Sequence, residues 1–122
     1  MSTTALPYND ACTVVETRAF VRSADNAGMT EAERSALVEM LAQNPSAGDL
    51  IVGSGGCRKL RLAGRGKGKS GGYRVITFFV REDRPVYLLW TFSKGSQANL
   101  TKAQVNELAA IAKTLARGVD ED

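Results

Sequence analysis

Residues 57–80 read CRKLRLAGRGKGKSGGYRVITFFV, in which two segments with strand periodicity flank a glycine-rich basic loop. In residues 57–63, Leu60 and Leu62 fall on one face of an extended chain and Lys59 and Arg61 on the other. Residues 73–80 are apolar on nearly both faces, as in a central strand, apart from a charged residue near the start. The stretch predicts two paired antiparallel strands.

Further strands are expected on either side of this pair. Residues 85–93 alternate as a third strand, and the turn at 82–85 joins it to the second as a hairpin. Residues 12–16 form a short run rich in β-branched residues, which predicts a first strand. Residues 48–56 are interpreted as a turn-rich connection.

Three helices are indicated by their N-terminal signals. Thr17 can cap a short helix, and Thr30 with Glu33 forms a capping box that opens a second one. Thr101 with Gln104 forms another capping box, followed by apolar residues at helical spacing. The C-terminal helix is therefore the best-signalled element.

The order β-α-α-β-β-β-α predicts an α+β fold with a small antiparallel sheet, helices packed on one face and a C-terminal helix. The 122 residues are expected to form a single domain, 1–122, with disorder at 1–10 and 119–122.

The charge distribution is strongly polarised. Between Asp49 and Glu82 the chain has no acidic residue and eight of its 16 Lys and Arg residues, which leaves 8 basic against 13 acidic residues elsewhere, a balance of −5. Such a local excess of positive charge is typical of a protein that binds a phosphate-bearing partner. The alternative is a solvated basic loop. The eight are Arg58, Lys59, Arg61, Arg65, Lys67, Lys69, Arg74 and Arg81.

Several classes of function are excluded or disfavoured. The chain has no histidine, which removes His-based acid–base pairs and catalytic triads and most zinc sites. Cys12 and Cys57 form no CxxC motif and are typical of a reduced cytoplasmic protein. Residues 1–10 lack the features of a secretory signal, and no apolar run reaches the length of a membrane span. We expect no cofactor and no metal.

Residues 63–70, AGRGKGKS, match the relaxed nucleotide-binding pattern [AG]xxxxGK[ST]. A phosphate-binding loop of that kind must be followed by a helix, whose N-terminus faces the phosphates. A strand is expected after Ser70 instead. We therefore interpret the segment as a flexible hairpin loop whose basic residues contact a nucleic-acid backbone, with Arg65, Lys67 and Lys69 as candidates.

Three cations on the predicted strands form the candidate catalytic group. Lys59 and Arg61 share a face of one strand, and Arg74 opens the next. We expect all three to be exposed and to converge on one phosphate. Arginine can stabilise the charge that develops during cleavage of a phosphodiester, and lysine can transfer a proton.

The strings GSGGCRKLR at 53–61 and GKGKSGGYRVI at 66–76 resemble the RelE/ParE superfamily of bacterial type II toxins, with the HigB-like branch most similar. The similarity continues through Tyr87, the segment Phe92-Ser93-Lys94 and Asn99, and covers roughly residues 12–116. It implies a RelE-like microbial-RNase-type fold.

The resemblance also implies a function. Such toxins enter the ribosomal A site and cleave translated mRNA by metal-independent attack of the 2′-hydroxyl on the adjacent phosphate, and a cognate antitoxin protein neutralises them. The family's catalytic positions match Lys59, Arg61 and Arg74. Contacts with RNA or the ribosome are expected from Arg58, Arg65, Lys67, Lys69, Phe92 and Lys94.

Two departures from the family pattern affect proton transfer. Related sequences often carry tyrosine where this chain has Phe92, which can stack on a base but cannot exchange a proton. Other HigB-like members use histidines, which are absent here. Lys59, Lys94 or ribosomal groups would have to replace them. The alternatives are a ParE-type gyrase inhibitor and a non-catalytic RNA-binding module.

Overall fold

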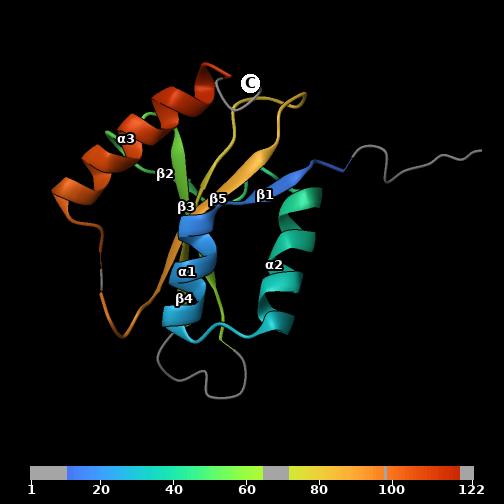
Figure 1. Cartoon of the computed structure of the whole chain (residues 1–122), viewed down its shortest axis with the longest axis vertical. Coiled ribbons are helices and arrows are strands. Elements are labelled where there is room, and N and C mark those ends of the chain that lie inside the picture. Colours follow the sequence, from blue (N-terminus) through green and yellow to red (C-terminus); the bar gives the residue numbers. More distant parts are fainter. Residues whose placement is uncertain (1–10, 65–71, 98, 119–122) are drawn as a thin grey trace, which may run out of the picture.

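A computed structural model of the protein describes residues 11–64, 72–97 and 99–118. The expected disorder at 1–10 and 119–122 lies outside these residues. Figure 1 shows three helices around a twisted sheet. In chain order the elements are β1 (Val14–Glu16), α1 (Arg18–Ala27), α2 (Glu31–Gln43), β2 (Asp49–Leu50), β3 (Cys57–Leu62), β4 (Tyr73–Phe78), β5 (Val86–Ser93) and α3 (Lys102–Ala116).

The sheet has five strands in the order β1-β5-β4-β3-β2. The predicted antiparallel meander β3-β4-β5 is confirmed. Two edge strands extend it: β1 runs parallel to β5, so the sheet is mixed, and β2 pairs antiparallel with β3. The interpretation of residues 48–56 as a connection alone was therefore wrong, because a two-residue strand is too short to give a periodic signal.

The helices begin where their caps indicate. Thr17 accepts a hydrogen bond from the Phe20 N–H and donates one to the Leu88 carbonyl at 2.8 Å, which ties the start of α1 to β5. Both predicted capping boxes, at the starts of α2 and α3, are present. Each cap satisfies N–H groups that the first helical turn leaves without an intrahelical partner.

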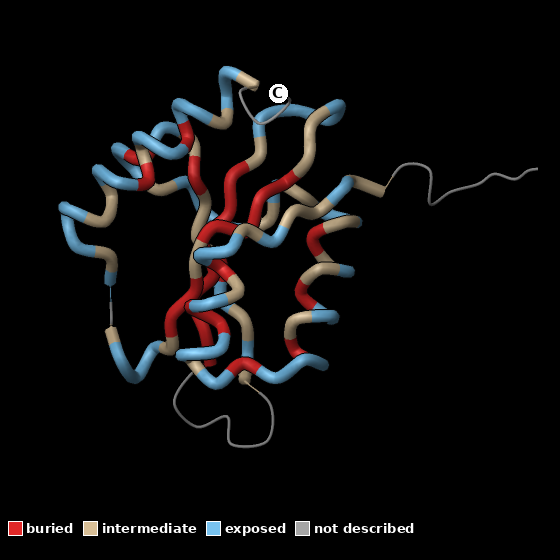
Figure 2. The backbone as a smooth tube through the Cα atoms, viewed as in Figure 1, coloured by how far each residue is buried: buried red, intermediate tan, exposed pale blue. Residues whose placement is uncertain are grey.

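Two apolar cores lie on opposite faces of the sheet. Phe20 and Ala24 of α1 and Leu37 and Leu41 of α2 pack on one face. Leu108 and Ala112 of α3 pack on the other. Figure 1 shows α3 on one side of the sheet and α2 on the opposite side, and the buried segments in Figure 2 lie between these layers. The α+β class is confirmed, with the C-terminal helix on the face opposite to α1 and α2.

The central strand β4 is buried along its whole length. Val75 faces the core beneath α1 and α2, whereas Ile76 and Phe78 face the core beneath α3. The two-sided apolar pattern of this segment predicted its central position correctly. It also means that Arg74, inside the same strand, is held where water has little access.

A buried hydrogen bond joins the start of β4 to the start of α2. The Tyr73 hydroxyl donates to Glu33 Oε1 at 2.9 Å, and the same oxygen accepts from the Thr30 N–H at 2.8 Å in the capping box. Glu33 is 4% exposed. Burial, followed by the hydrogen bond and charge of Glu33, raises the pKa of Tyr73.

Changing Tyr73 to Phe should lower the free energy of unfolding by about 1.5–3 kcal/mol, because a buried carboxylate loses a hydrogen bond. Glu33→Gln is the matched control, since its amide oxygen can still accept from Tyr73 and from the cap, and it should cost less. Urea denaturation measures both changes. Equal stability of Tyr73→Phe and the parent would contradict a structural role for this bond.

The same bond predicts a loss of stability in alkali. Because the pKa of Tyr73 is raised in the folded state, the contribution is complete below the ordinary tyrosine pKa and is lost as pH rises through the higher folded value. Urea denaturation at a series of alkaline pH values should show a smaller decline for Tyr73→Phe than for the parent. Identical declines would mean that other groups cause the loss.

Candidate active site

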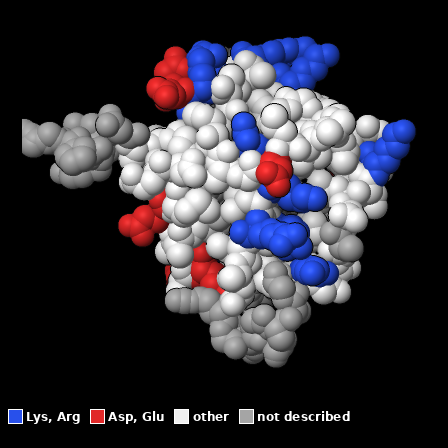
Figure 3. Space-filling model, turned by 180° about the vertical axis from the view of Figure 1, so that it is seen from behind, with Lys and Arg blue, Asp and Glu red and all other residues white. Residues whose placement is uncertain are grey.

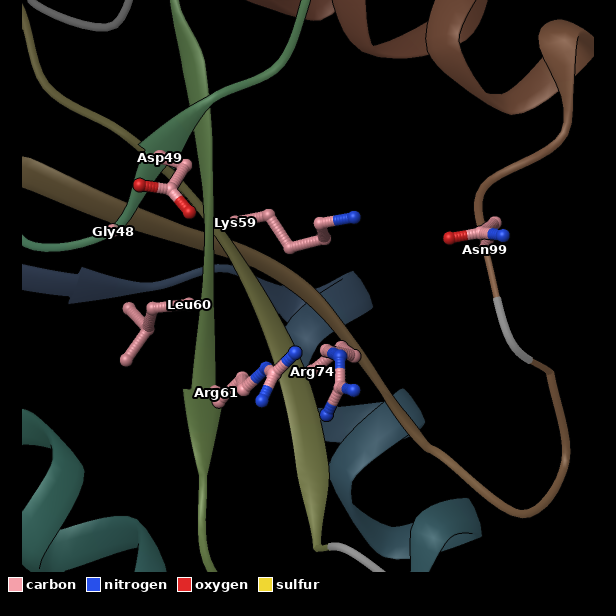
Figure 4. Close-up of a pocket in the computed structure, with 7 residues that line it drawn as sticks. All are labelled: Gly48, Asp49, Lys59, Leu60, Arg61, Arg74 and Asn99. Atoms are coloured by element: carbon pink, nitrogen blue, oxygen red, sulfur yellow. The ribbon is translucent and has the colours of Figure 1, made fainter.

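The pairing of β3 with β4 brings the three predicted catalytic cations together. Arg61 and Arg74 are directly opposed in the antiparallel pair β3–β4, so their side chains share a face of the sheet. Lys59 precedes Arg61 by two residues on β3 and shares that face. Figure 4 shows the two guanidinium groups next to each other and the Lys59 side chain extending toward Asn99.

These side chains line an open cleft of about 490 Å³. One wall is formed by β2, β3 and β4, and the other is reached by the segment that precedes α3. The cleft is large enough to admit a phosphate with parts of the adjoining sugar. The described residues that line it are Gly48, Asp49, Lys59, Leu60, Arg61, Arg74 and Asn99.

Arg74 is buried rather than exposed, which corrects the expectation from sequence. Only 8% of its surface is accessible, and its Nη1 has no hydrogen-bond partner among the described residues. Burial follows from its position in a central strand that is covered on both faces. An uncompensated buried guanidinium is costly, so the arrangement favours an anion as the missing partner.

The charges of the cleft also favour a bound anion. Like charges directly opposite one another on paired strands are destabilising, and Arg61 and Arg74 have this relationship. Arginine presents several N–H donors in a planar fork that suits phosphate oxygens. A phosphate between the two guanidinium groups would therefore remove the repulsion and supply acceptors to the buried donor.

Two polar side chains of the cleft were not recognised as site residues from the sequence. Asp49 lies on the short strand β2, opposite Lys59, and Asn99 lies just before the capping box of α3. One feature of the sequence could have drawn attention to Asp49: it is the last acidic residue before the stretch 50–81, which has none, and it is followed by the apolar residues Leu50 and Ile51. The sequence around Asn99 does not indicate that this residue lies at the cleft, because its distance from the strands depends on the path of the chain before α3.

Arg58 is separated from the catalytic group. It alternates with Lys59 and therefore projects from the other face of β3, where its Nη1 donates to the Gly48 carbonyl at 3.1 Å. Arg58 therefore does not line the cleft, and its predicted contact with RNA or the ribosome stays a prediction. Lys94 is exposed just beyond β5 and does not line the cleft, so its predicted contact stays a prediction.

Phe92 packs inside the protein. It is 5% exposed, belongs to the core beneath α3, and its ring lies 5.6 Å from that of Trp90. The prediction that Phe92 stacks on RNA does not fit this burial, because so little of the ring is exposed to a base. Its side chain instead packs in the core beneath α3, near the C-terminal end of β5.

The basic surface extends beyond the cleft. Figure 3 shows Lys and Arg side chains gathered near the middle of one face of the molecule, with an acidic side chain among them. Arg65, Lys67 and Lys69 lie outside the described residues, so their predicted contacts stay predictions. Among the described residues, no group of three His, Cys, Asp or Glu side chains is placed to hold a metal ion.

The fold is that of a small α+β protein, and its cleft gathers three cations whose arrangement would suit an anion. Residues 12–122 match the family described as the RelE toxin of the RelE/RelB toxin–antitoxin system. The chain belongs to this RelE toxin family, and membership implies a partner antitoxin.

A solved structure shares the architecture. A double arginine-to-alanine mutant of the E. coli toxin RelE, in the free state, superposes with a TM-score of 0.50 over 83% of this chain and 96% of that chain, at 16% sequence identity. This likeness confirms the RelE fold. Within the described residues, no helix has the length and apolar character needed to cross a bilayer.

Replacing Arg74 with Met should raise the free energy of unfolding by about 1 kcal/mol or more in phosphate-free buffer, because it removes a buried unpaired charge at similar volume. Arg61→Ala, at an exposed position, should stay within about 0.5 kcal/mol of the parent. Arg22→Ala on α1 is a matched exposed control. Urea denaturation is the measurement.

The companion measurement is the melting temperature in phosphate or sulfate against chloride at constant ionic strength. Phosphate should raise the melting temperature of the parent and of Arg22→Ala more than that of Arg74→Met. A destabilised Arg74→Met protein with an unchanged phosphate response would show that Arg74 is a structural residue and not an anion ligand.

Proposed function

We propose that this protein is a ribosome-dependent endoribonuclease toxin of the HigB-like type, which cleaves translated mRNA in the ribosomal A site. The observation that carries the proposal is the buried guanidinium of Arg74, with an unpaired Nη1, directly opposite Arg61 in a cleft that also contains Lys59. Membership of the RelE toxin family supports the same reading.

The reaction we propose is attack of a ribose 2′-hydroxyl on the adjacent phosphate, which forms a 2′,3′-cyclic phosphate and releases a 5′-hydroxyl. Arg61 and Arg74 bind the phosphate oxygens and stabilise the additional negative charge of the transition state. Lys59 lies beside them and transfers a proton. The roles need no metal ion, because the guanidinium groups supply the positive charge.

Binding to the ribosome involves a wider set of groups. Arg65, Lys67, Lys69 and Lys94 are proposed to contact rRNA or mRNA backbones, which would hold the cleft against one phosphodiester. The setting is the cytoplasm, where the toxin meets translating ribosomes and its antitoxin partner.

Single-turnover cleavage of mRNA on purified, programmed ribosomes tests the chemical proposal. Arg61→Ala and Arg74→Met should each slow cleavage by about 10²–10³-fold, as expected for loss of a well-placed transition-state donor. The double variant should lose less than the product of the two single losses if both residues serve one phosphate. Arg22→Ala, far from the cleft in sequence, should cleave at the parental rate.

Two other results would point to different functions. Intact mRNA together with inhibition of gyrase would indicate a ParE-type toxin. Ribosome binding without cleavage by the parental protein would indicate a non-catalytic RNA-binding module. Parental cleavage rates in folded, ribosome-bound Arg74→Met protein would show that the cleft is not the active site.

The loop lysines have a separate test. Replacing Lys67 and Lys69 together with Gln should weaken ribosome binding and flatten its dependence on salt, because each phosphate contact releases condensed counterions. Binding titrations over a range of salt concentrations measure the slope. An unchanged slope would identify these lysines as solvated charges.

A further inference from the structure

A carboxylate lies within the cationic cleft. Asp49 of β2 is the direct antiparallel partner of Lys59, so the two side chains project from the same face with Cβ atoms about 4.5–5.5 Å apart. Asp49 is exposed and lines the cleft with Arg61 and Arg74. Figure 4 shows the Asp49 side chain near the backbone of Lys59, whereas the amino end of Lys59 extends away from it toward Asn99.

The approach of β2 to β3 depends on the residue before Asp49. Gly48 has φ of +98°, and a Cβ at this position would lie 2.8 Å from the Lys59 carbonyl oxygen. Only glycine fits such a contact without displacing a strand. The backbone therefore fixes Asp49 beside Lys59, even though β2 contains just two residues.

The other candidate proton acceptors are unsuitable. The chain has no histidine, and the Tyr73 hydroxyl is engaged with Glu33 on the opposite face of the sheet. Burial raises the pKa of Cys57 to about 11, so its thiol stays protonated at neutral pH. Among the described residues that line the cleft, Asp49 has the only carboxylate, and no ion pair occupies it within this part of the chain.

We propose that Asp49 is the general base of the reaction and that Lys59 is its general acid. This inference rests on the proposed function, because it assigns a proton acceptor to mRNA cleavage. An ionised carboxylate only accepts hydrogen bonds and a lysine ammonium only donates them, so the pair supplies one group of each kind at neighbouring positions.

The pair takes up one proton and gives one proton in each reaction, so the protons balance. Asp49 takes the proton of the 2′-hydroxyl while the 2′-oxygen forms its bond to phosphorus. The bond from phosphorus to the 5′-oxygen breaks, and Lys59 gives that oxygen a proton. The protein is left with a carboxylic acid and an amine. Asp49 then releases its proton to water and Lys59 takes one from water, which restores the starting state without a further reactant.

The first experiment separates binding from chemistry on programmed ribosomes. Asp49→Asn keeps the size of the side chain at an exposed position and should slow single-turnover cleavage by about 10²–10⁴-fold, the usual contribution of a general base. Its affinity for the ribosome should be equal or higher, because a negative charge has left a phosphate site. Asp25→Asn, an exposed acidic position on α1, should match the parent in both measurements.

Two further measurements assign the proton. Formate should partly restore cleavage by Asp49→Ala, because a small carboxylate can enter the vacated space, and chloride should not. An mRNA with a 5′-bridging sulfur at the mapped cleavage position has a leaving group that needs no protonation. It should rescue Lys59→Met and should not rescue Asp49→Asn.

Three other results would each overturn the assignment of Asp49 as the general base, and they can be told apart. Parental cleavage by Asp49→Asn, alongside slow cleavage by Arg61→Ala, would reject the base and leave the proposed function standing. Rescue of Asp49→Asn by the sulfur substrate, without rescue of Asp49→Ala by formate, would show that Asp49 acts by orienting Lys59. Intact mRNA with the parental protein would reject the proposed function and this inference together.

Discussion

The burial of β4 on both faces is the constraint on which the rest of the structure depends. Its apolar residues join two cores, one beneath α1 and α2 and the other beneath α3. Because the strand is continuous, Arg74 is carried into the interior by its neighbours. The hydrophobic effect that stabilises the fold thus holds a guanidinium in a place where it is costly in the absence of an anion.

Both positive and negative side chains surround the Arg74 guanidinium in the cleft. Arg61 repels Arg74 across the β3–β4 pair, whereas Asp49 on β2 lies opposite Lys59, two residues along β3 from Arg61. A bound phosphate would offset the first interaction, and the carboxylate partly compensates the remaining cations. Functional sites commonly retain such unfavourable arrangements because binding or catalysis requires them, at some expense in stability.

The family resemblance and the geometry contribute different things. Family membership rests on a match over residues 12–122, and the solved E. coli relative, at 16% identity, supports the fold alone. The proposed chemistry depends on the side chains of this chain. Phe92 is buried and histidine is absent, so the proposed reaction would need other proton-transfer groups than tyrosine or histidine. Asp49 and Lys59 are the pair that the strand register brings together.

The sequence by itself determined the helix starts, the meander and the grouping of Lys59, Arg61 and Arg74, because capping and strand periodicity are local properties of the chain. Only the tertiary structure decided the positions of β1 and β2 at the sheet edges, the side on which α3 packs, and the burial of Arg74 and Phe92. It also placed Asp49 and Asn99 at the cleft. These features arise from contacts between segments distant in sequence, and no local pattern of residues encodes which faces will meet.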